Sequence, residues 1–275
     1  MTTGTRAPIA VICALDDELM HLREALPPSR EEWQGNRRVW YTELDGQPIV
    51  LALCGLGMIA AAAATESVIL HHAPAAVLNF GCTGAHRREL LPGDLVVGAR
   101  VVAYDSGTQE PDGSETFYGM RYLRQGVQEK ALFLPADPGL LARAMRVAAS
   151  LEGQHEPWPI DVEWPAEIPH RGPILVAGTV ASADRWNRMP ARIEALVRLH
   201  GSHCEDMEAG AIALVCASHD VPFLTVKDIS NNELLRVTDA GADFLAVYRN
   251  QLGRRAGAVV LGILRDMAAA GESAG

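Results

Sequence analysis

The sequence has few aromatic residues, few cysteines and no basic cluster. Only 5% of its 275 residues are aromatic although 48% are hydrophobic, so small aliphatic side chains must fill most of any core. The formal net charge is −10, and Lys and Arg occur in no run longer than a pair. Proteins that bind nucleic acid or acidic membranes through charge need a positive surface patch, which this sequence lacks. We therefore expect neither a nucleic-acid nor a membrane partner.

Disulfide, metal and targeting signals are also missing. The odd number and scattered spacing of the cysteines fit neither a disulfide framework nor a metal site; they are Cys13, Cys54, Cys82, Cys204 and Cys216. His71 and His72 lack the i, i+4 spacing of helical metal ligands, so we predict no metal and no other cofactor. Residues 1–8 do not resemble a signal peptide, and no apolar run is long enough to span a membrane. These features predict a soluble, cytoplasmic protein with reduced thiols.

Short apolar runs alternate with helical patterns along the chain. The apolar runs predict strands over Pro8–Ala14, Ala75–Phe80, Leu95–Tyr104, Ile174–Val180 and Val221–Val226, and Arg37–Leu44 with Pro48–Cys54 predicts a hairpin. Helical patterns cover Ile59–His72, Pro138–Leu151, Ala191–His200, Ala209–Ser218 and Ala240–Met267. Residues 105–131 and 152–172 show no periodicity, which predicts two long loops. The alternation predicts one α/β domain over residues 1–275 with a parallel or mixed sheet.

Carboxylates gather at two points where a strand and a helix meet. Asp16, Asp17 and Glu18 follow the first strand, and further acids at 205, 206 and 208 precede the helix Ala209–Ser218. Acids in the first turn of a helix stabilise its dipole, which is a structural explanation for both groups. Polar groups beyond the carboxyl ends of strands also line ligand crevices in open α/β sheets. Both interpretations are open on these residues alone.

Small and polar residues mark three other junctions. We interpret Gly55-Leu56-Gly57 and Gly81-Cys82-Thr83-Gly84 as places where the backbone comes close to a neighbour or a ligand. The first segment lacks the third glycine of a dinucleotide fingerprint. No base stands beside Cys82 in the sequence, which favours a structural role over that of a nucleophile. Lys227, Asp228, Ser230 and Asn231 follow the last predicted strand and form a further cluster of polar side chains.

Four of these motifs, in this order, resemble those of a known family. They are Ala14–Glu18, Asn79–Gly84 followed by Pro92–Val97, Asp206–Ala209, and Val226–Asn231. The sequence resembles the nucleoside phosphorylase/nucleosidase superfamily, and within it the methylthioadenosine/S-adenosylhomocysteine nucleosidases, over residues 8–265. The resemblance implies a single-domain three-layer α/β/α sandwich with a central mixed, partly closed sheet. It also implies a homodimer whose small-molecule partner is a purine nucleoside.

The resemblance implies a role for each matching residue on the sugar side. Glu18 matches the carboxylate that activates the attacking water, and Met207 and Glu208 match the ribose-binding pair, with Asp206 in the same block. Cleavage of a purine N-glycosidic bond passes through an oxocarbenium-like sugar. One carboxylate on the sugar hydroxyls would stabilise that charge and a second would take a proton from water.

On the base side, Trp186 falls where the family places an aromatic ring against the purine, and Ser230 matches a residue that supports the purine-facing acid. Cys82, Thr83 and Gly84 fall near the nucleophile and the base.

The sequence departs from the family at this purine-facing acid. Nucleosidases have an aspartate at purine N7, and this chain has Asn231, whose amide donates a hydrogen bond but cannot transfer a proton. Asparagine reads the N6/N7 edge of adenine, so adenine nucleosides are compatible with it. In relatives that act on 6-oxopurines, including futalosine hydrolases, an asparagine meets the base, so futalosine or inosine is the other expected substrate class. Asp228, three residues upstream in a strand, is expected to face the opposite side.

Two other functions are open. The hexameric phosphorylases hold phosphate with an arginine where this chain has Asn79, and Asp17 and Glu18 would repel phosphate, so water is the favoured nucleophile. Arg87 and Arg88 lie close to Asn79 in the sequence and could bind phosphate instead. Phosphate is therefore a further candidate partner, and the corresponding alternative function is a phosphate-dependent purine nucleoside phosphorylase. The alternative of another class is a nucleoside-binding protein that has lost turnover because of Asn231.

Overall fold

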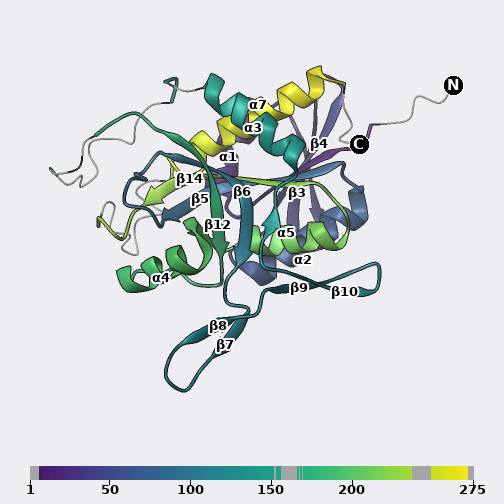
Figure 1. Ribbon diagram of the computed structural model, residues 1–275. Helices are drawn as coiled ribbons and strands as arrows, with labels where there is room; N and C mark the ends of the chain where they lie inside the picture. The colour runs from purple at the N-terminus through teal and green to yellow at the C-terminus, as the bar shows by residue number, and fades with distance from the viewer. Residues whose placement is uncertain are drawn as a thin grey trace.

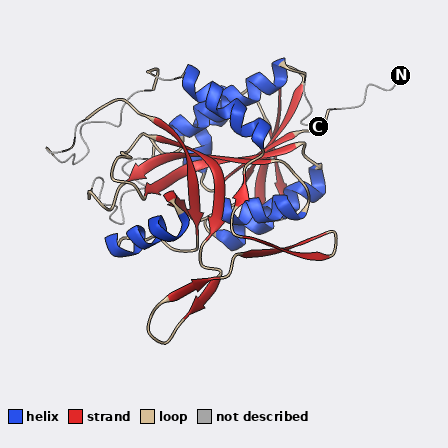
Figure 2. Ribbon diagram, viewed as in Figure 1, coloured by secondary structure: helices blue, strands red, loops and turns tan. Residues whose placement is uncertain are grey.

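The computed structural model describes residues 6–151, 153–155, 166, 168, 170–236 and 249–271. A central sheet lies between two layers of helices (Figure 1, Figure 2). One layer contains α1 (Asp16–Ala25), α3 (Pro138–Ser150) and α7 (Arg254–Ala269). The other contains α2 (Met58–His72) and α5 (Ala209–Ser218), with α4 (Pro190–His200) beside β12 and β13. The predicted three-layer α/β/α sandwich is confirmed.

The main sheet is mixed and partly closed, as predicted. Its strands are β1 (Ile9–Cys13), β2 (Arg30–Gln34), β3 (Arg37–Leu44), β4 (Gln47–Leu53), β5 (Ala76–Ala85), β6 (Leu95–Ala103), β11 (Leu134–Pro135), β12 (Leu175–Ser182), β13 (Ser202–Asp206) and β14 (Phe223–Asn231). The order is β11-β6-β12-β13-β5-β1-β4-β3-β2, and β14 pairs with both β5 and β6. Strands β6, β12, β13, β5 and β14 therefore close into a ring.

Two strands run further than the sequence predicts. The small residues 81–85 are predicted to follow a strand but lie inside β5, and Lys227 to Asn231 likewise lie inside β14. The reason is pairing on both sides, since the end of β5 is hydrogen-bonded to both β13 and β14. Backbone pairing of this kind can hold residues of low strand propensity in an extended conformation.

The first of the two predicted loops contains short strands in the structure. Residues 105–131 form two hairpins, β7 (Gly107–Gln109) with β8 (Glu115–Phe117), and β9 (Met120–Arg124) with β10 (Val127–Ala131). Both hairpins project from the body of the molecule (Figure 1), so their side chains lack the alternating burial that would mark a strand in the sequence. Gln125 and Gly126 both have positive φ, as a two-residue hairpin turn requires. Most of the second predicted loop, 152–172, lies outside the described residues.

The C-terminal helix begins later than the sequence predicts. Residues 249–253 form turns, and α7 starts at Arg254, whereas the predicted helix starts at Ala240. Residues 237–248 lie outside the described residues. In the ranges that the structure describes, no helix is long and apolar enough to cross a membrane.

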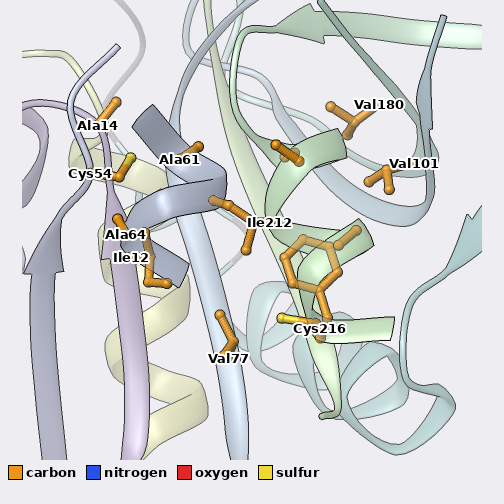
Figure 3. Packing of buried hydrophobic residues seen from close by; sticks show 14 of the residues in the cluster. Ile12, Ala14, Cys54, Ala61, Ala64, Val77, Val101, Val180, Ile212 and Cys216 are labelled. Atoms are coloured by element: carbon orange, nitrogen blue, oxygen red, sulfur yellow. The ribbon is translucent and has the colours of Figure 1, made fainter. Parts of the chain in front are cut away.

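Small side chains allow the helices to pack closely on the sheet. Ala61 and Ala64 of α2, Ile212 of α5 and Val77 of β5 belong to one buried cluster (Figure 3). A Cβ atom at Gly210 of α5 would lie 2.9 Å from Ser182 Cβ, so only glycine allows this approach. The close packing of α5 places its N-terminus, and the acids that precede it, at the rim of the strand ring.

Candidate active site

A cavity opens at the rim of the strand ring, where β5 meets both β13 and β14. Gly84 of β5 pairs with Glu205 of β13 on one side and with Asn231 of β14 on the other. The cavity is lined by Ala14, Leu15, Glu18, Leu56, Cys82, Thr83, Gly84, Arg185, Trp186, Glu205, Asp206, Met207, Glu208, Ser230 and Asn231. The structure thus brings together all the site residues that the sequence predicts.

Glu18 is held at one end of the cavity by the first turn of α1. One carboxylate oxygen accepts a hydrogen bond from the Cys82 N–H (2.7 Å), and the other accepts from the Leu15 N–H (3.2 Å) and the Cys13 thiol (3.3 Å). A Cβ atom at Gly81 would lie 2.8 Å from Glu18 Oε1, so this position needs glycine. Burial and then the charge of Glu18 raise the pKa of the Cys82 thiol well above its usual value. Cys82 therefore stays protonated, which argues against a role as nucleophile.

Glu208 is held by the N-terminus of α2. Its Oε1 accepts from the Gly57 N–H (2.9 Å), and its Oε2 accepts from the Met207 N–H (3.3 Å). Gly57 has φ of 97°, and a Cβ there would lie 2.8 Å from Asp184 Oδ1. The predicted close backbone approach at Gly55-x-Gly57 is confirmed, with Asp184 and Glu208 as the neighbours. Burial, followed by the charge of Asp206, raises the pKa of Glu208 to about 7.

A buried ion pair lies behind these carboxylates. Lys227 Nζ is 2.7 Å from Asp206 Oδ2, and both side chains are almost completely buried. Asp206 also accepts from the Ser182 hydroxyl (2.5 Å) and the Ala209 N–H (3.0 Å), so it caps α5 as well. Burial lowers the pKa of Lys227, but the charges of Asp206 and Glu208 outweigh burial and raise it. Lys227 therefore stays cationic and partly offsets the cluster of acids.

The opposite end of the cavity carries the amide of Asn231. The Ser230 hydroxyl donates to Asn231 Oδ1 (3.0 Å), and Asn231 Nδ2 donates to Glu233 Oε1 (3.2 Å). Trp186 is 45% exposed and flanks the cavity in the loop after β12. Thr83 turns its hydroxyl toward the Glu205 carbonyl, so it faces the cavity mainly with its other atoms.

Asp228 lies on the other face of β14, as predicted. Its Oδ2 accepts from the Arg255 N–H of α7 at 2.9 Å, and Asp228 is not among the residues that line the cavity. It therefore cannot replace an acid at position 231.

The basic residues considered for phosphate binding are not in the cavity. Arg87 donates to the Ser202 and Gly201 carbonyls, and Arg88 is exposed and does not line the site. Asn79 is buried and bonded to the Ile12 carbonyl and Thr225. Among the cavity-lining residues that the structure describes, Arg185 is the single basic one, and it lies on the Trp186 side. In the same described ranges, no group of His, Cys, Asp or Glu side chains could hold a metal ion.

A sequence model of the phosphorylase superfamily matches residues 8–265. The chain belongs to this superfamily.

Relatives in the superfamily match along almost the whole chain. A 5'-methylthioadenosine/S-adenosylhomocysteine nucleosidase of Shewanella piezotolerans is 27% identical over 261 residues, which cover 94% of this chain and 99% of the relative. The nucleosidase of Neisseria meningitidis, solved with methylthio-immucillin-A, has a TM-score of 0.73 at 23% identity, covering 94% of this chain and 99% of that one. The futalosine hydrolase of Helicobacter pylori has a TM-score of 0.74 at 20% identity, covering 94% and 97%. The two structures share the fold of this superfamily member.

Several residues that lie at or behind the cavity were not among the predicted site residues. Arg185 and Leu56 line it next to residues that were predicted. Glu205 also lines it, although its place before a helix suggested a dipole contact. Lys227 supplies the buried cation. A lysine directly after a buried apolar strand was the available signal, because a buried lysine requires a paired acid.

Proposed function

We propose that the protein is a purine nucleosidase, which hydrolyses the N-glycosidic bond of a purine nucleoside. The observation that carries the proposal is the placement of two buried carboxylates, Glu18 and Glu208, on one cavity whose other end holds Asn231. Each carboxylate is fixed by backbone N–H groups, as a preorganised catalytic group must be.

The reaction uses the carboxylates in different ways. Glu208 accepts hydrogen bonds from the sugar hydroxyls, and its negative charge stabilises the positive charge that develops on the sugar. Glu18 accepts a proton from the attacking water, whose oxygen bonds to the anomeric carbon as the bond to the base breaks. The bonding electron pair leaves with the base, and Asn231 donates a hydrogen bond to it. Met207 and Trp186 supply the apolar surfaces for the sugar and the base.

Charge favours water over phosphate as the nucleophile. Four acids line the cavity, and the one described basic residue there, Arg185, is on the base side and not beside Glu18. A phosphate dianion next to Glu18 would be repelled by these charges. The arrangement therefore favours hydrolysis over phosphorolysis.

The relatives suggest the class of nucleoside. Two of the curated relatives are named for methylthioadenosine and adenosylhomocysteine, and one structural neighbour is a futalosine hydrolase. These names share a purine nucleoside that is modified at the 5' position. We propose the same class of substrate here.

The proposal includes a cytoplasmic homodimer. Leu56 lines the cavity and is 56% exposed, and Ile59 of the adjoining α2 is 82% exposed. Large exposed apolar side chains at the edge of a cavity favour a protein contact, and a second copy would cover the open side of the cavity. Free thiols at the described cysteines agree with a reducing compartment. Sedimentation of the purified protein tests the dimer, and a monomer at micromolar concentration would exclude it.

The test of the activity is release of free base, measured by chromatography with methylthioadenosine, adenosylhomocysteine, inosine and futalosine. We expect release from at least one of them in phosphate-free buffer. Ligand-induced stabilisation without base release would indicate a binding protein instead. Release that requires phosphate would indicate a phosphorylase.

A further inference from the structure

The base end of the cavity holds a carboxylate that the proposed reaction does not use. Strand β5 runs along the cavity from Cys82, whose N–H contacts Glu18, to Gly84, which pairs with Glu205 and Asn231. Two residues of strand span about 7 Å. Glu205 and Asn231 therefore lie on either side of Gly84, at the end of the cavity away from Glu18.

Glu205 is buried and held in place by a polar network. The Asn187 N–H donates to Oε1 (2.7 Å), while the Asn187 side-chain amide (2.5 Å) and the Tyr104 hydroxyl (3.4 Å) donate to Oε2. His86 Nε2 lies 3.3 Å from the same Oε2. Burial, and then the charge of Glu205, raise the pKa of Tyr104, so its hydroxyl keeps its proton.

The network leaves one side of Glu205 available to a ligand. An ionised carboxylate offers about two acceptor positions on each oxygen. Oε2 accepts from several donors, but Oε1 accepts from the Asn187 N–H alone among the contacts in the described residues. Because Glu205 lines the cavity, an unused acceptor position on Oε1 can serve the bound base.

The chemistry of the purine edge decides which base fits. When N7 faces Asn231, the substituent at position 6 and then N1 follow around the ring, at the end farthest from the sugar. In a 6-oxopurine N1 carries a hydrogen, whereas in adenine N1 is a hydrogen-bond acceptor. A carboxylate accepts hydrogen bonds and cannot donate one. Opposite N1 of adenine, two acceptors would face each other in a buried site.

We propose that Glu205 is a specificity-determining residue that selects purines with a hydrogen on N1, namely 6-oxopurines, by accepting a hydrogen bond from N1–H. The proposal rests on the proposed nucleosidase function and names its base class. Sites built to hydrogen-bond one ligand group reject analogues that lack it by factors of about 10⁴–10⁵ at best. Because Glu205 makes a single such contact, we expect 6-oxopurines to bind at least about 10²-fold more tightly than adenine.

Direct binding of free bases tests this without any turnover. Calorimetry with the full-length protein compares hypoxanthine, 1-methylhypoxanthine and adenine. Hypoxanthine should bind at least about 10²-fold more tightly than either of the others, since they lack N1–H. Equal affinity for hypoxanthine and 1-methylhypoxanthine, or tighter binding of adenine, would overturn the role of Glu205. Base release from adenine nucleosides in that case would leave the nucleosidase proposal intact.

The variant Glu205→Gln tests the residue itself. Its amide can donate to N1 of adenine, so the ratio of hypoxanthine to adenine affinity should fall by at least about 10-fold. Glu66→Gln is the control, since Glu66 of α2 pairs with His219 at the end of α5 and does not line the cavity. An unchanged ratio in folded Glu205→Gln would contradict the proposal. If that variant does not fold, the affinities of the wild-type protein for the three bases still test the role of Glu205. Absence of both base binding and base release would overturn the nucleosidase proposal together with this one.

Discussion

Asn231→Asp should convert the base-side amide into a general acid. In the native chain Asn231 Nδ2 donates to Glu233 Oε1 at 3.2 Å, while Ser230 donates to Oδ1. The substitution replaces that nitrogen with a carboxyl oxygen at the same distance from Glu233. Two carboxylates this close cannot both stay ionised near neutral pH, so the pair shares a proton and one pKa rises.

The size of the effect follows from the chemistry that the new carboxyl would add. A proton donated to N7 as the base leaves typically accelerates such a step by about 10²–10⁴-fold. The gain should appear in kcat for adenine nucleosides, whose departure depends most on protonation. KM should change less, because the proposed sugar contacts, Glu208 and Met207, are not altered by the substitution.

The assay is adenine release from methylthioadenosine over a range of pH, with wild type, Asn231→Asp and the double variant Asn231→Asp/Glu233→Gln. The double variant removes the carboxylate that raises the pKa, so its rate should decline at a lower pH than that of the single variant. An Asn231→Asp rate within a few-fold of wild type would refute the reasoning, and would mean that the geometry around the base has diverged as well.

Further predictions concern Glu18 and Glu208, two of the four acids that line the cavity, and the buried Asp228. Glu208→Gln should lower kcat/KM by about 10²–10³-fold with an unchanged melting temperature, because it removes the charge opposite the oxocarbenium ion; steady-state kinetics and calorimetry check this, and unchanged kcat/KM would reject the role. Glu18→Gln should lower kcat by about 10²–10⁴-fold with little change in KM, since it removes the base that accepts the proton of water. The kcat/KM of the wild type should decline as pH falls below about 7, because the pKa of Glu208 is raised to about 7 and its protonated form lacks the charge. Burial raises the pKa of Asp228 from 3.8 to about 7, so the folded state binds this proton more tightly, and stability is greatest below the unfolded pKa and is lost as pH rises through about 7. Asp228→Asn should reduce that loss in thermal melts at pH 5 and 8, and an identical pH dependence would contradict it.

Local patterns were sufficient to predict the helices and strands with regular periodicity. The hairpin of β3 and β4 and the helix α5 match their predicted spans closely, since turn residues and small apolar residues mark their ends. Strand β2 is polar and partly exposed, and β13 is polar but buried, so neither has the apolar run of a predictable strand. The hairpins after β6 are mainly exposed and carry no burial pattern for the same reason.

The site was predictable where its residues lie in short motifs at strand ends. Glu18, Glu208 and Asn231 each belong to such a motif, and the structure gathers the motifs around one cavity. The orientation of Glu205 depends on the pairing of β13 with β5 at Gly84, a contact between residues far apart in the chain. Likewise the Lys227–Asp206 ion pair joins β14 to β13, and no local sequence pattern predicts that these two side chains meet.

The identity of the sugar product is the most direct test of water attack at Glu18. The protein would be incubated with its preferred purine nucleoside in excess phosphate, and the product analysed by mass spectrometry. Because four acids line the cavity, we predict free sugar even when phosphate is abundant. Sugar 1-phosphate as the main product would contradict hydrolysis and would assign the chain to the phosphorylases of its superfamily.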